Sequence, residues 1–316
     1  MNGKSPRPRR TTAVTSHFLT ESRRERFYLL AKSGRKIWNL YRQSTPGMIG
    51  LSMILFFVGM AVLAPVLATH DDPWSIEWRG VNPEYASPSL KFPFGTDFYG
   101  RDMWSLTVIG SRASLIVGFL ASLISIVIGT GVGLGAGYFG KVADESLMRL
   151  TDFFLVLPWF PLMIVFMMLF GLSFTNVIIV IGITSWPSTA RIVRAQVLST
   201  KERAFVERAK AVGAGSGRIL WRHILPNVFP LIFANTILLI ANSIFSESFL
   251  DFFGLGDPTV ISWGTMLEAA YEYHAFEALA WWVILAPGLS IILLIMAFYL
   301  MGDALDEVLN PKLRKR

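Results

Sequence analysis

Six long apolar runs constrain this sequence more than any other feature. They cover about residues 47–68, 112–138, 148–170, 175–192, 228–250 and 280–302, and a helix needs roughly 20 apolar residues to cross a bilayer. No Lys or Arg occurs between Arg149 and Arg191 or between Arg222 and Lys312. Stretches without basic residues suit a lipid solvent, where a charge is costly. The sequence therefore predicts an all-α membrane protein with six transmembrane helices.

Composition and motifs exclude several classes of function. Charged residues make up 16% of the chain, against roughly a quarter in soluble domains. The chain has no cysteine, which excludes disulfides, a thiolate nucleophile and a Cys-ligated metal. It contains no GxxxxGK[ST], HExxH or GxSxG pattern, so we expect no P-loop ATP site, no metal site and no catalytic site. The glycines at 129, 131, 133, 135 and 137 lie inside an apolar run, which favours close helix packing over dinucleotide binding.

The basic residues indicate the topology. Of the 29 Lys and Arg residues, all except Arg79, Lys91, Arg101 and Arg112 fall in segments that one side of the membrane can hold. The positive-inside rule then predicts a protein of the cell (inner) membrane with both termini in the cytoplasm. We interpret the basic arm, residues 1–45, as a retained topology signal near anionic lipid rather than a nucleic-acid site. Residues 1–20 are expected to be disordered, and residues 21–42 to form an amphipathic helix on the membrane surface.

Few polar groups lie at membrane depth. Asp152 is one turn from Arg149, and this spacing predicts a structural ion pair. Asn235 and Asn242 are seven residues apart and share one helix face, with Glu247 closer to the outer end of the same run. We expect the asparagine face to form either a seam between helices or the wall of a translocation path, and Glu247 is a further candidate for lining that path.

The long connection from 193 to 227 predicts a folded surface. Its Ala, Val, Arg, Lys and Glu residues have helical spacing and are followed by Gly213, Gly215 and Gly217. We expect an amphipathic helix, a glycine-rich turn and a second short helix. Pro226 should end that segment and start the fifth membrane helix, since proline is tolerated in a first helical turn. Such a loop is typical of a docking site for another protein.

Residues 202–227 read ERAFVERAKAVGAGSGRILWRHILPN. This segment resembles the EAA loop of permease subunits in binding-protein-dependent ABC importers. The residues in register with that motif are Glu207, Ala209, Gly213, Leu225 and Pro226. Arg208 and His223 depart from the pattern at the middle of the EAA triplet and at the Ile position.

Further segments resemble one subfamily, the OppC/DppC-type permeases of peptide and nickel importers. They are FPFGTDFYGRDMWS (92–105), GSRASLIVG (110–118), GAGYFG (135–140), MRLTD (148–152), WPSTARIVRAQVLSTKE (186–202), SFLDFFGLG (248–256), SWGTML (262–267) and MGDALDEVLNPK (301–312). The resemblance covers roughly residues 46–312, and the basic arm lies outside it.

The resemblance implies a type I ABC importer transmembrane domain. Residues 46–111 would then form the first transmembrane helix and an outer loop, residues 112–302 the core with coupling loop 202–226, and residues 303–316 a cytoplasmic tail. The implied partners are a DppB-like sister permease, two ABC ATPase subunits that hold ATP and Mg, and an extracytoplasmic solute-binding protein. This chain would bind no cofactor. Asp97, Arg101 and Asp102 in the outer loop are candidates for contact with the binding protein.

The resemblance also implies a transport role without enzymatic chemistry in this chain. The expected cargo is a di- or oligopeptide, moved inward by alternating access. Oligosaccharides or nickel chelates carried by the same machinery remain the alternative. An ion-driven secondary transporter is a distant second, because such proteins are built from inverted repeats and we find no internal repeat in the sequence.

Overall fold

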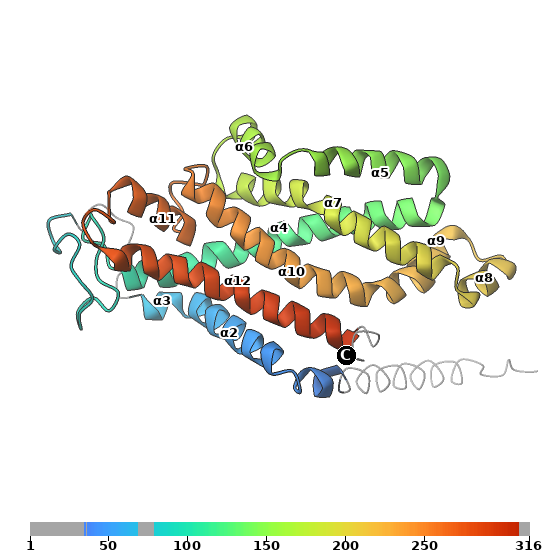
Figure 1. Cartoon of the computed structure of the whole chain (residues 1–316), viewed down its shortest axis with the longest axis horizontal. Helices are drawn as coiled ribbons and strands as arrows, with labels where there is room; N and C mark the ends of the chain where they lie inside the picture. The colour runs from blue at the N-terminus through green and yellow to red at the C-terminus, as the bar shows by residue number, and fades with distance from the viewer. Residues whose placement is uncertain (1–34, 36, 69–78, 310–316) are drawn as a thin grey trace, which may run out of the picture.

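The computed structural model describes residue 35, residues 37–68 and residues 79–309, and within these ranges it contains helices and no strand. The helices, labelled in Figure 1, are α2 (Thr45–Val62), α3 (Ala64–Leu67), α4 (Met103–Phe139), α5 (Lys141–Val156), α6 (Trp159–Phe170), α7 (Phe174–Lys201), α8 (Ala204–Ala211), α9 (Ser216–Ile219), α10 (Leu225–Phe252), α11 (Trp263–Glu272) and α12 (Trp281–Leu309). The predictions for residues 1–34 lie outside the described residues.

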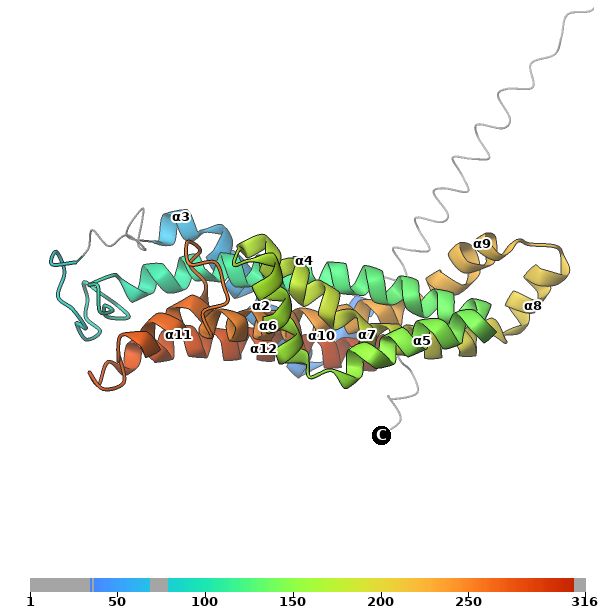
Figure 2. The ribbon, with the colours of Figure 1, turned by 90° about the horizontal axis from the view of Figure 1, so that it is seen from above.

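The long helices run side by side in an elongated bundle (Figures 1 and 2). Five of them are long and apolar enough to cross a membrane: α2, α4, α7, the continuous stretch Ser216–Phe252, and α12. The pair α5 and α6 makes a sixth span if it is counted as one. The prediction of six spans is therefore confirmed with one bent member.

The third apolar run is not the straight helix that its length suggested. Its two halves, α5 and α6, meet at a bend of 93°. Leu157 and Pro158 separate them, and both have extended backbone, with ψ of 133° and 121°. A proline disfavours the helical conformation of the residue before it, so the Leu157-Pro158 step ends α5 and allows α6 to turn across the bundle.

The bundle has two distinct ends, which we call the α8 end and the α11 end. The α8 end carries α8, α9 and the turn between them (Figure 1). The α11 end carries α11 and the coil 79–102 that leads into α4. Asp102 begins α4 as its N-cap, because its carboxylate accepts hydrogen bonds from the backbone N–H groups of Trp104 and Ser105.

Helices α4 and α7 have the most extensive contact of any helix pair in the described residues. Gly129, Gly133 and Gly137 face α7 at intervals of four residues, and a Cβ atom on any of them would lie 2.6–2.8 Å from atoms of Thr189, of Ala190 and Val193, or of Val197, respectively. Only residues without a side chain permit this approach. The packing interpretation of these glycines is confirmed.

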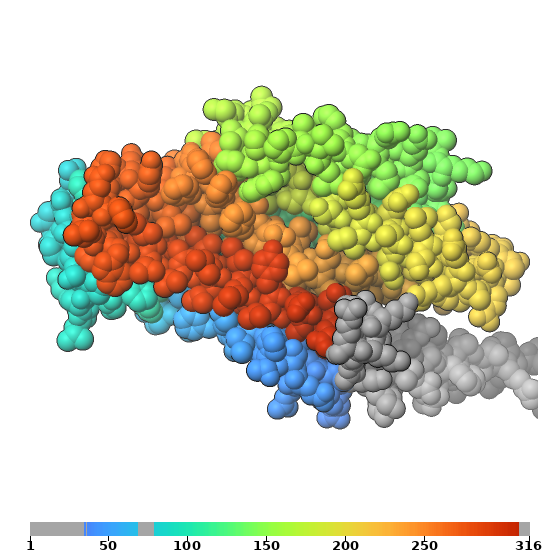
Figure 3. Space-filling model, viewed as in Figure 1, coloured from blue at the N-terminus to red at the C-terminus, as the bar shows by residue number. Residues whose placement is uncertain are grey.

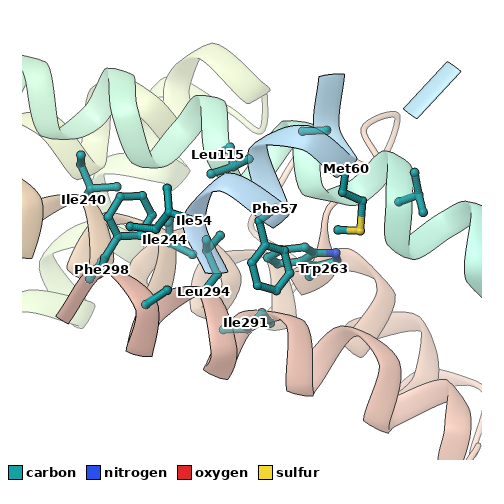
Figure 4. Packing of buried hydrophobic residues seen from close by; sticks show 14 of the residues in the cluster. Ile54, Phe57, Met60, Leu115, Ile240, Ile244, Trp263, Ile291, Leu294 and Phe298 are labelled. Atoms are coloured by element: carbon teal, nitrogen blue, oxygen red, sulfur yellow. The ribbon is translucent and has the colours of Figure 1, made fainter. Parts of the chain in front are cut away.

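A buried cluster joins α2 to the rest of the bundle (Figure 4). Phe57 of α2 packs edge-on against Trp263 of α11, with ring centroids 5.6 Å apart. The indole N–H of Trp263 donates to the Thr107 carbonyl of α4 at 2.9 Å. One fully buried tryptophan therefore holds α2, α4 and α11 together.

Helix α2 breaks before it reaches the α11 end. Pro65 has no N–H with which to donate to the carbonyl of Ala61, four residues earlier. The Nε atom of Arg112 on α4 donates to that carbonyl instead, at 2.7 Å. The helix is interrupted at Leu63 and resumes as the short α3.

Candidate functional site

The loop at the α8 end has a buried face and a presented face. Val206 and Ala209 of α8 are buried and belong to an apolar cluster with Val193 and Val197 of α7. Glu207 lies between them in sequence and is exposed. The two motif residues therefore have different tasks, since Ala209 fixes α8 on α7 while Glu207 faces outward.

Gly213 forms the turn that follows α8. Its φ is +79°, a conformation that residues with a Cβ atom resist. Its N–H donates to the Lys210 carbonyl at 2.9 Å, and the N–H of Ala214 donates to the Ala209 carbonyl at 3.0 Å. These bonds satisfy the last carbonyls of α8 and give the helix a defined end. The predicted helix, glycine turn and second short helix are all present.

The prediction that the second short helix ends at Pro226 was wrong, but Pro226 does lie in the first turn of the next membrane helix, as predicted. Residues Leu220–Ile224 form a π-helical turn that joins α9 to α10 without a gap. Pro226 has no N–H for the carbonyl of Arg222, while Leu225 donates its N–H five residues back, to Leu220. Because Pro226 falls in the first turn of α10, where its missing N–H costs little, the chain continues as a helix.

Two apolar side chains stand out from this loop. Val212, next to the glycine turn, is 84% exposed, and Trp221 on the π-helical turn is 73% exposed. Exposed Trp side chains are common anchors in protein interfaces. We did not single out either residue from the sequence, although a tryptophan within a charged loop is a signal that could have been used.

A cavity of about 630 Å³ opens at the middle of the bundle, between the α5–α6 bend, α7 and α10. Figure 3 shows this face of the molecule. The cavity wall combines amides, hydroxyls and aromatic rings, and the described residues that line it carry no charge; they include Asn235, Asn242, Ser188, Thr189, Trp159 and Phe245. Such a wall can donate and accept hydrogen bonds without selecting for one sign of charge.

The structure separates the three residues considered for a translocation path. Asn235 and Asn242 line the cavity and also join helices, because Asn235 donates to Thr189 of α7 at 3.0 Å and Tyr299 of α12 donates to Asn242 at 3.0 Å. Glu247 is 1% exposed and accepts hydrogen bonds from Ser114 of α4 at 3.1 and 3.2 Å. In this structure, Glu247 lies between helices rather than on the cavity wall.

The ion pair predicted for Asp152 has a different partner. Asp152 of α5 binds Arg191 of α7 at 2.6 Å, while Arg149 lies 3.9 Å from Glu145. A second pair, Asp144 with Arg194 at 2.5 Å, joins the same two helices. The prediction of Arg149 as the partner was wrong, because spacing along one helix does not account for a cation on a neighbouring helix.

The coil 79–102 at the α11 end is built around a buried ion pair. Asp97 and Arg101 are 2.6 Å apart and both are buried. Burial raises the pKa of the Asp97 carboxyl above its ordinary value, while Arg101 and the N–H groups of Arg101 and Tyr99 oppose that rise. Asp102 is also buried, at the α4 cap. The sequence made these three residues candidates for contact with the binding protein. In the structure they are buried and stabilise the coil.

Aromatic contacts join this coil to the segment after α11. Tyr85 donates to the carbonyl of Tyr273 at 2.5 Å, and the rings of Phe98 and Tyr273 stack with centroids 5.0 Å apart. The indole N–H of Trp282 donates to the Thr96 carbonyl at 3.0 Å. Two segments that are far apart in the sequence therefore form one surface, which we call the cap (residues 79–102 and 263–283).

Two protein families match separate parts of this chain. Residues 125–315 match the family described as "Binding-protein-dependent transport system inner membrane component". Residues 33–86 match the "N-terminal TM domain of oligopeptide transport permease C". The second match contains α2, and the first begins within α4 and contains every later helix.

Curated relatives are similar over most of their length. The dipeptide transport system permease protein DppC of Bacillus subtilis is 36% identical over 88% of this chain and 85% of its own. The oligopeptide transport system permease protein OppC of the same organism is 32% identical over 90% and 93%. The di/tripeptide permease DppC of Pseudomonas aeruginosa is 34% identical over 89% and 92%.

A solved structure shares the fold. The inward-facing MetNI methionine ABC transporter superposes with a TM-score of 0.52 at 20% identity, covering 66% of this chain and 97% of that chain. Sequence family, curated relatives and fold all agree. The chain is a multi-pass inner-membrane protein that belongs to the binding-protein-dependent transport system inner membrane component family, in the branch that contains the DppC and OppC permeases.

Proposed function

We propose that this chain is one permease subunit of an ATP-driven importer that carries di- or oligopeptides into the cell. The observation that carries the proposal is the loop at the α8 end. It has a fixed buried face, a defined glycine turn and an exposed face with Glu207, Val212 and Trp221. This exposed face docks into an ATPase subunit, and ATP and Mg are held there rather than by this chain.

The coupling follows from how the loop is connected. Helix α7 enters α8 after only a short break, and the π-helical turn leads directly into α10. A displacement of α8 by the ATPase therefore reaches two helices that line the 630 Å³ cavity. Movement of these helices opens the cavity alternately to the two sides of the membrane.

The other subunits are assigned by position. A DppB-like sister permease completes the path against the cavity face, where Asn235 and Asn242 lie. The cap receives the solute-binding protein, which places the α11 end outside and both termini inside. Peptides are favoured as cargo because the curated relatives are named for peptides and because an uncharged amide and hydroxyl wall can bind peptide backbone.

Co-purification followed by transport tests the proposal. The tagged chain is extracted from native membranes in mild detergent, and the bound chains are identified by mass spectrometry. We expect a second permease and P-loop ATPases. The complex is then placed in vesicles with ATP inside and the binding protein outside, and uptake of labelled dipeptides is compared with that of an oligosaccharide and a nickel chelate.

Each outcome has a separate meaning. Uptake of peptides alone supports peptides as the cargo. Uptake of another solute alone would identify that solute as the cargo, and the chain would still be a subunit of an ATP-driven importer. Isolation of the chain without an ATPase, together with uptake driven by an ion gradient, would favour the secondary-transporter reading instead.

A further inference from the structure

A second cavity lies far from the translocation face. It is a groove of about 470 Å³ between α2, α12 and the part of the cap that contains Pro88, Pro93 and Phe94. In Figure 1, α2 and α12 lie along the edge of the bundle opposite α5 and α6. The groove therefore does not belong to the cavity that we assign to the path.

The groove wall is apolar along its whole length. Leu285, Leu289 and Leu293 follow one another at intervals of four residues on α12, opposite Phe56 and Met60 of α2. The eight residue steps from Leu285 to Leu293 correspond to about 12 Å along the helix axis. The length of the groove therefore lies along the spans and not across them.

The two hydroxyl groups in the wall already donate hydrogen bonds within the chain. Thr107 donates to the Met103 carbonyl at 2.6 Å, and Ser290 donates to the Ala286 carbonyl at 2.8 Å. A ligand in the groove therefore meets hydrocarbon and aromatic surface and no free hydroxyl. This excludes a polar solute as the occupant.

Three tryptophans mark one end of the groove. Trp104 and Trp282 donate their indole N–H groups to the carbonyls of Leu67 and Thr96, both at 3.0 Å. The indole N–H of Trp281 has no partner within the part of the chain that the structure describes, and this residue is exposed. Tryptophan is enriched where hydrocarbon meets lipid head groups, so the tryptophan end lies at the membrane boundary.

The groove opens sideways towards the bilayer. Its leucines Leu285, Leu289 and Leu293 are each more than a third exposed. In the most apolar stretch of α12, only 33% of the residues are buried by the rest of the chain. The surrounding medium at this depth is the hydrocarbon of the inner membrane, established by the family. The groove is thus continuous with the lipid-facing surface of the protein.

We propose that the groove between α2 and α12 binds one acyl chain of a phospholipid from the leaflet around the α11 end. The acyl chain lies along Leu285, Leu289 and Leu293, and the N–H of Trp281 donates to an ester carbonyl or phosphate oxygen of the same lipid. The lipid fills the space between the added N-terminal helix and the core, and it holds α2 in place.

The source of the binding energy can be named. Lipid tails are as apolar as leucine side chains, so the hydrophobic effect gives no preference for this site over the bulk bilayer. The preference comes from dispersion contacts on several sides of the chain and from the void that would otherwise remain. An acyl chain therefore prefers the groove to the bulk bilayer by only a modest factor, and the bound lipid exchanges with the bilayer.

Photolabelling within the intact complex tests the site. The complex is reconstituted into phosphatidylethanolamine and phosphatidylglycerol vesicles that contain phosphatidylglycerol with a diazirine on its acyl chain. Labelled residues are mapped by mass spectrometry. We expect labelling at Leu289 to exceed labelling at Ile292 by roughly fivefold, which corresponds to a preference of about 1 kcal/mol. Ile292 is the internal control, because it is 59% exposed on the same helix and does not line the groove.

Filling the groove supplies the second arm. Ala286 lies in the wall, and Ala286→Trp should reduce labelling at Leu289 by the same factor while leaving Ile292 unchanged. Ile292→Trp is the matched control and should leave Leu289 labelled. If Ala286→Trp fails to fold, Ala286→Leu and the wild-type comparison still decide the question.

Two results would overturn the site. Equal labelling of Leu289 and Ile292 means that the groove holds only exchanging bulk lipid. Labelling at Ile292 with none at Leu289 means that lipid does not enter the groove. The readout does not involve cargo or ATP, so failure of the lipid site leaves the transport proposal untouched.

Discussion

The two ends of the bundle are built in opposite ways. The loop at the α8 end is mainly local. Its turn and its π-helical junction come from residues 202–225, and Val206 and Ala209 share a cluster with Val193 and Val197 of the adjoining α7, which Ile126 of α4 also joins. The cap at the α11 end joins two segments that are distant in the sequence, and the bond from Tyr85 to Tyr273 links residues 188 positions apart. The loop buries apolar side chains and exposes its charges, whereas the cap buries an ion pair. The surface that we propose to dock on an ATPase subunit and the surface that we propose to receive the binding protein thus use different chemistry.

Gly213→Pro is expected to have the largest effect on the loop. Proline cannot adopt the positive φ of this position and removes the N–H that binds Lys210. We expect transport in proteoliposomes to fall to background while the membrane helices stay folded by circular dichroism. Gly215→Ala is the matched control, because Gly215 has a φ of −66° and open space around its Cβ position. Normal transport by a folded Gly213→Pro variant would contradict the coupling role.

Arg101→Leu is expected to have the largest effect on the cap. It leaves Asp97 buried without its cation, which costs about 3–5 kcal/mol in comparable buried pairs. We expect residues 79–102 to become sensitive to limited proteolysis, while ATPase subunits remain bound at the other end.

The pH dependence of that variant follows from the sign of the shift. Burial raises the pKa of Asp97 in the folded chain, and loss of Arg101 removes an opposing contribution. A carboxyl with a raised folded pKa destabilises the fold when it is ionised. Protection from proteolysis should therefore recover as the pH falls through that pKa. The double variant Asp97→Leu/Arg101→Leu should show no such recovery.

Substitutions at Glu207 and Ala209 test the exposed face and the buried face of α8 separately. Glu207→Ala removes an exposed side chain and should change stability by less than about 0.5 kcal/mol, yet it should abolish transport and weaken ATPase retention. Ala209→Leu overfills a buried position and should cost about 1–3 kcal/mol in thermal unfolding. If both variants lose stability and transport together, the distinction between the two faces of α8 is wrong.

Tyr99→Phe should produce the smallest change. A hydrogen bond with Tyr99, together with burial, raises the pKa of Tyr273 to about 12. The associated stability of the cap is complete below the ordinary pKa of about 10 and is lost between there and 12. Removal of the Tyr99 hydroxyl should lower the Tyr273 pKa towards 10 in a tyrosinate absorbance titration. Tyr271→Phe, at an exposed position, should leave that titration step unchanged.

The contrast between the ends also explains what the sequence could predict. The spans, the glycine stripe and the α8 loop were predictable because each depends on spacing within one segment. The 93° bend was present as Leu157-Pro158 but was hidden by the apolar run around it. Asp152 was assigned to the wrong arginine, and the burial of Asp97, Arg101 and Asp102 was missed, because these depend on the arrangement of neighbouring elements. Whether Glu207, Gly213 and the other motif residues couple to an ATPase remains a prediction.

The bond from Arg112 to the Ala61 carbonyl makes two distant positions genetically dependent on each other. In a chain with alanine at position 65, the backbone would satisfy that carbonyl itself, and Arg112 would be dispensable for this purpose. With proline present, loss of the arginine leaves the carbonyl of the buried Ala61 without this donor. The effect of Arg112→Leu should thus be severe in the wild-type background and mild beside Pro65→Ala, so neither substitution can be ranked by itself.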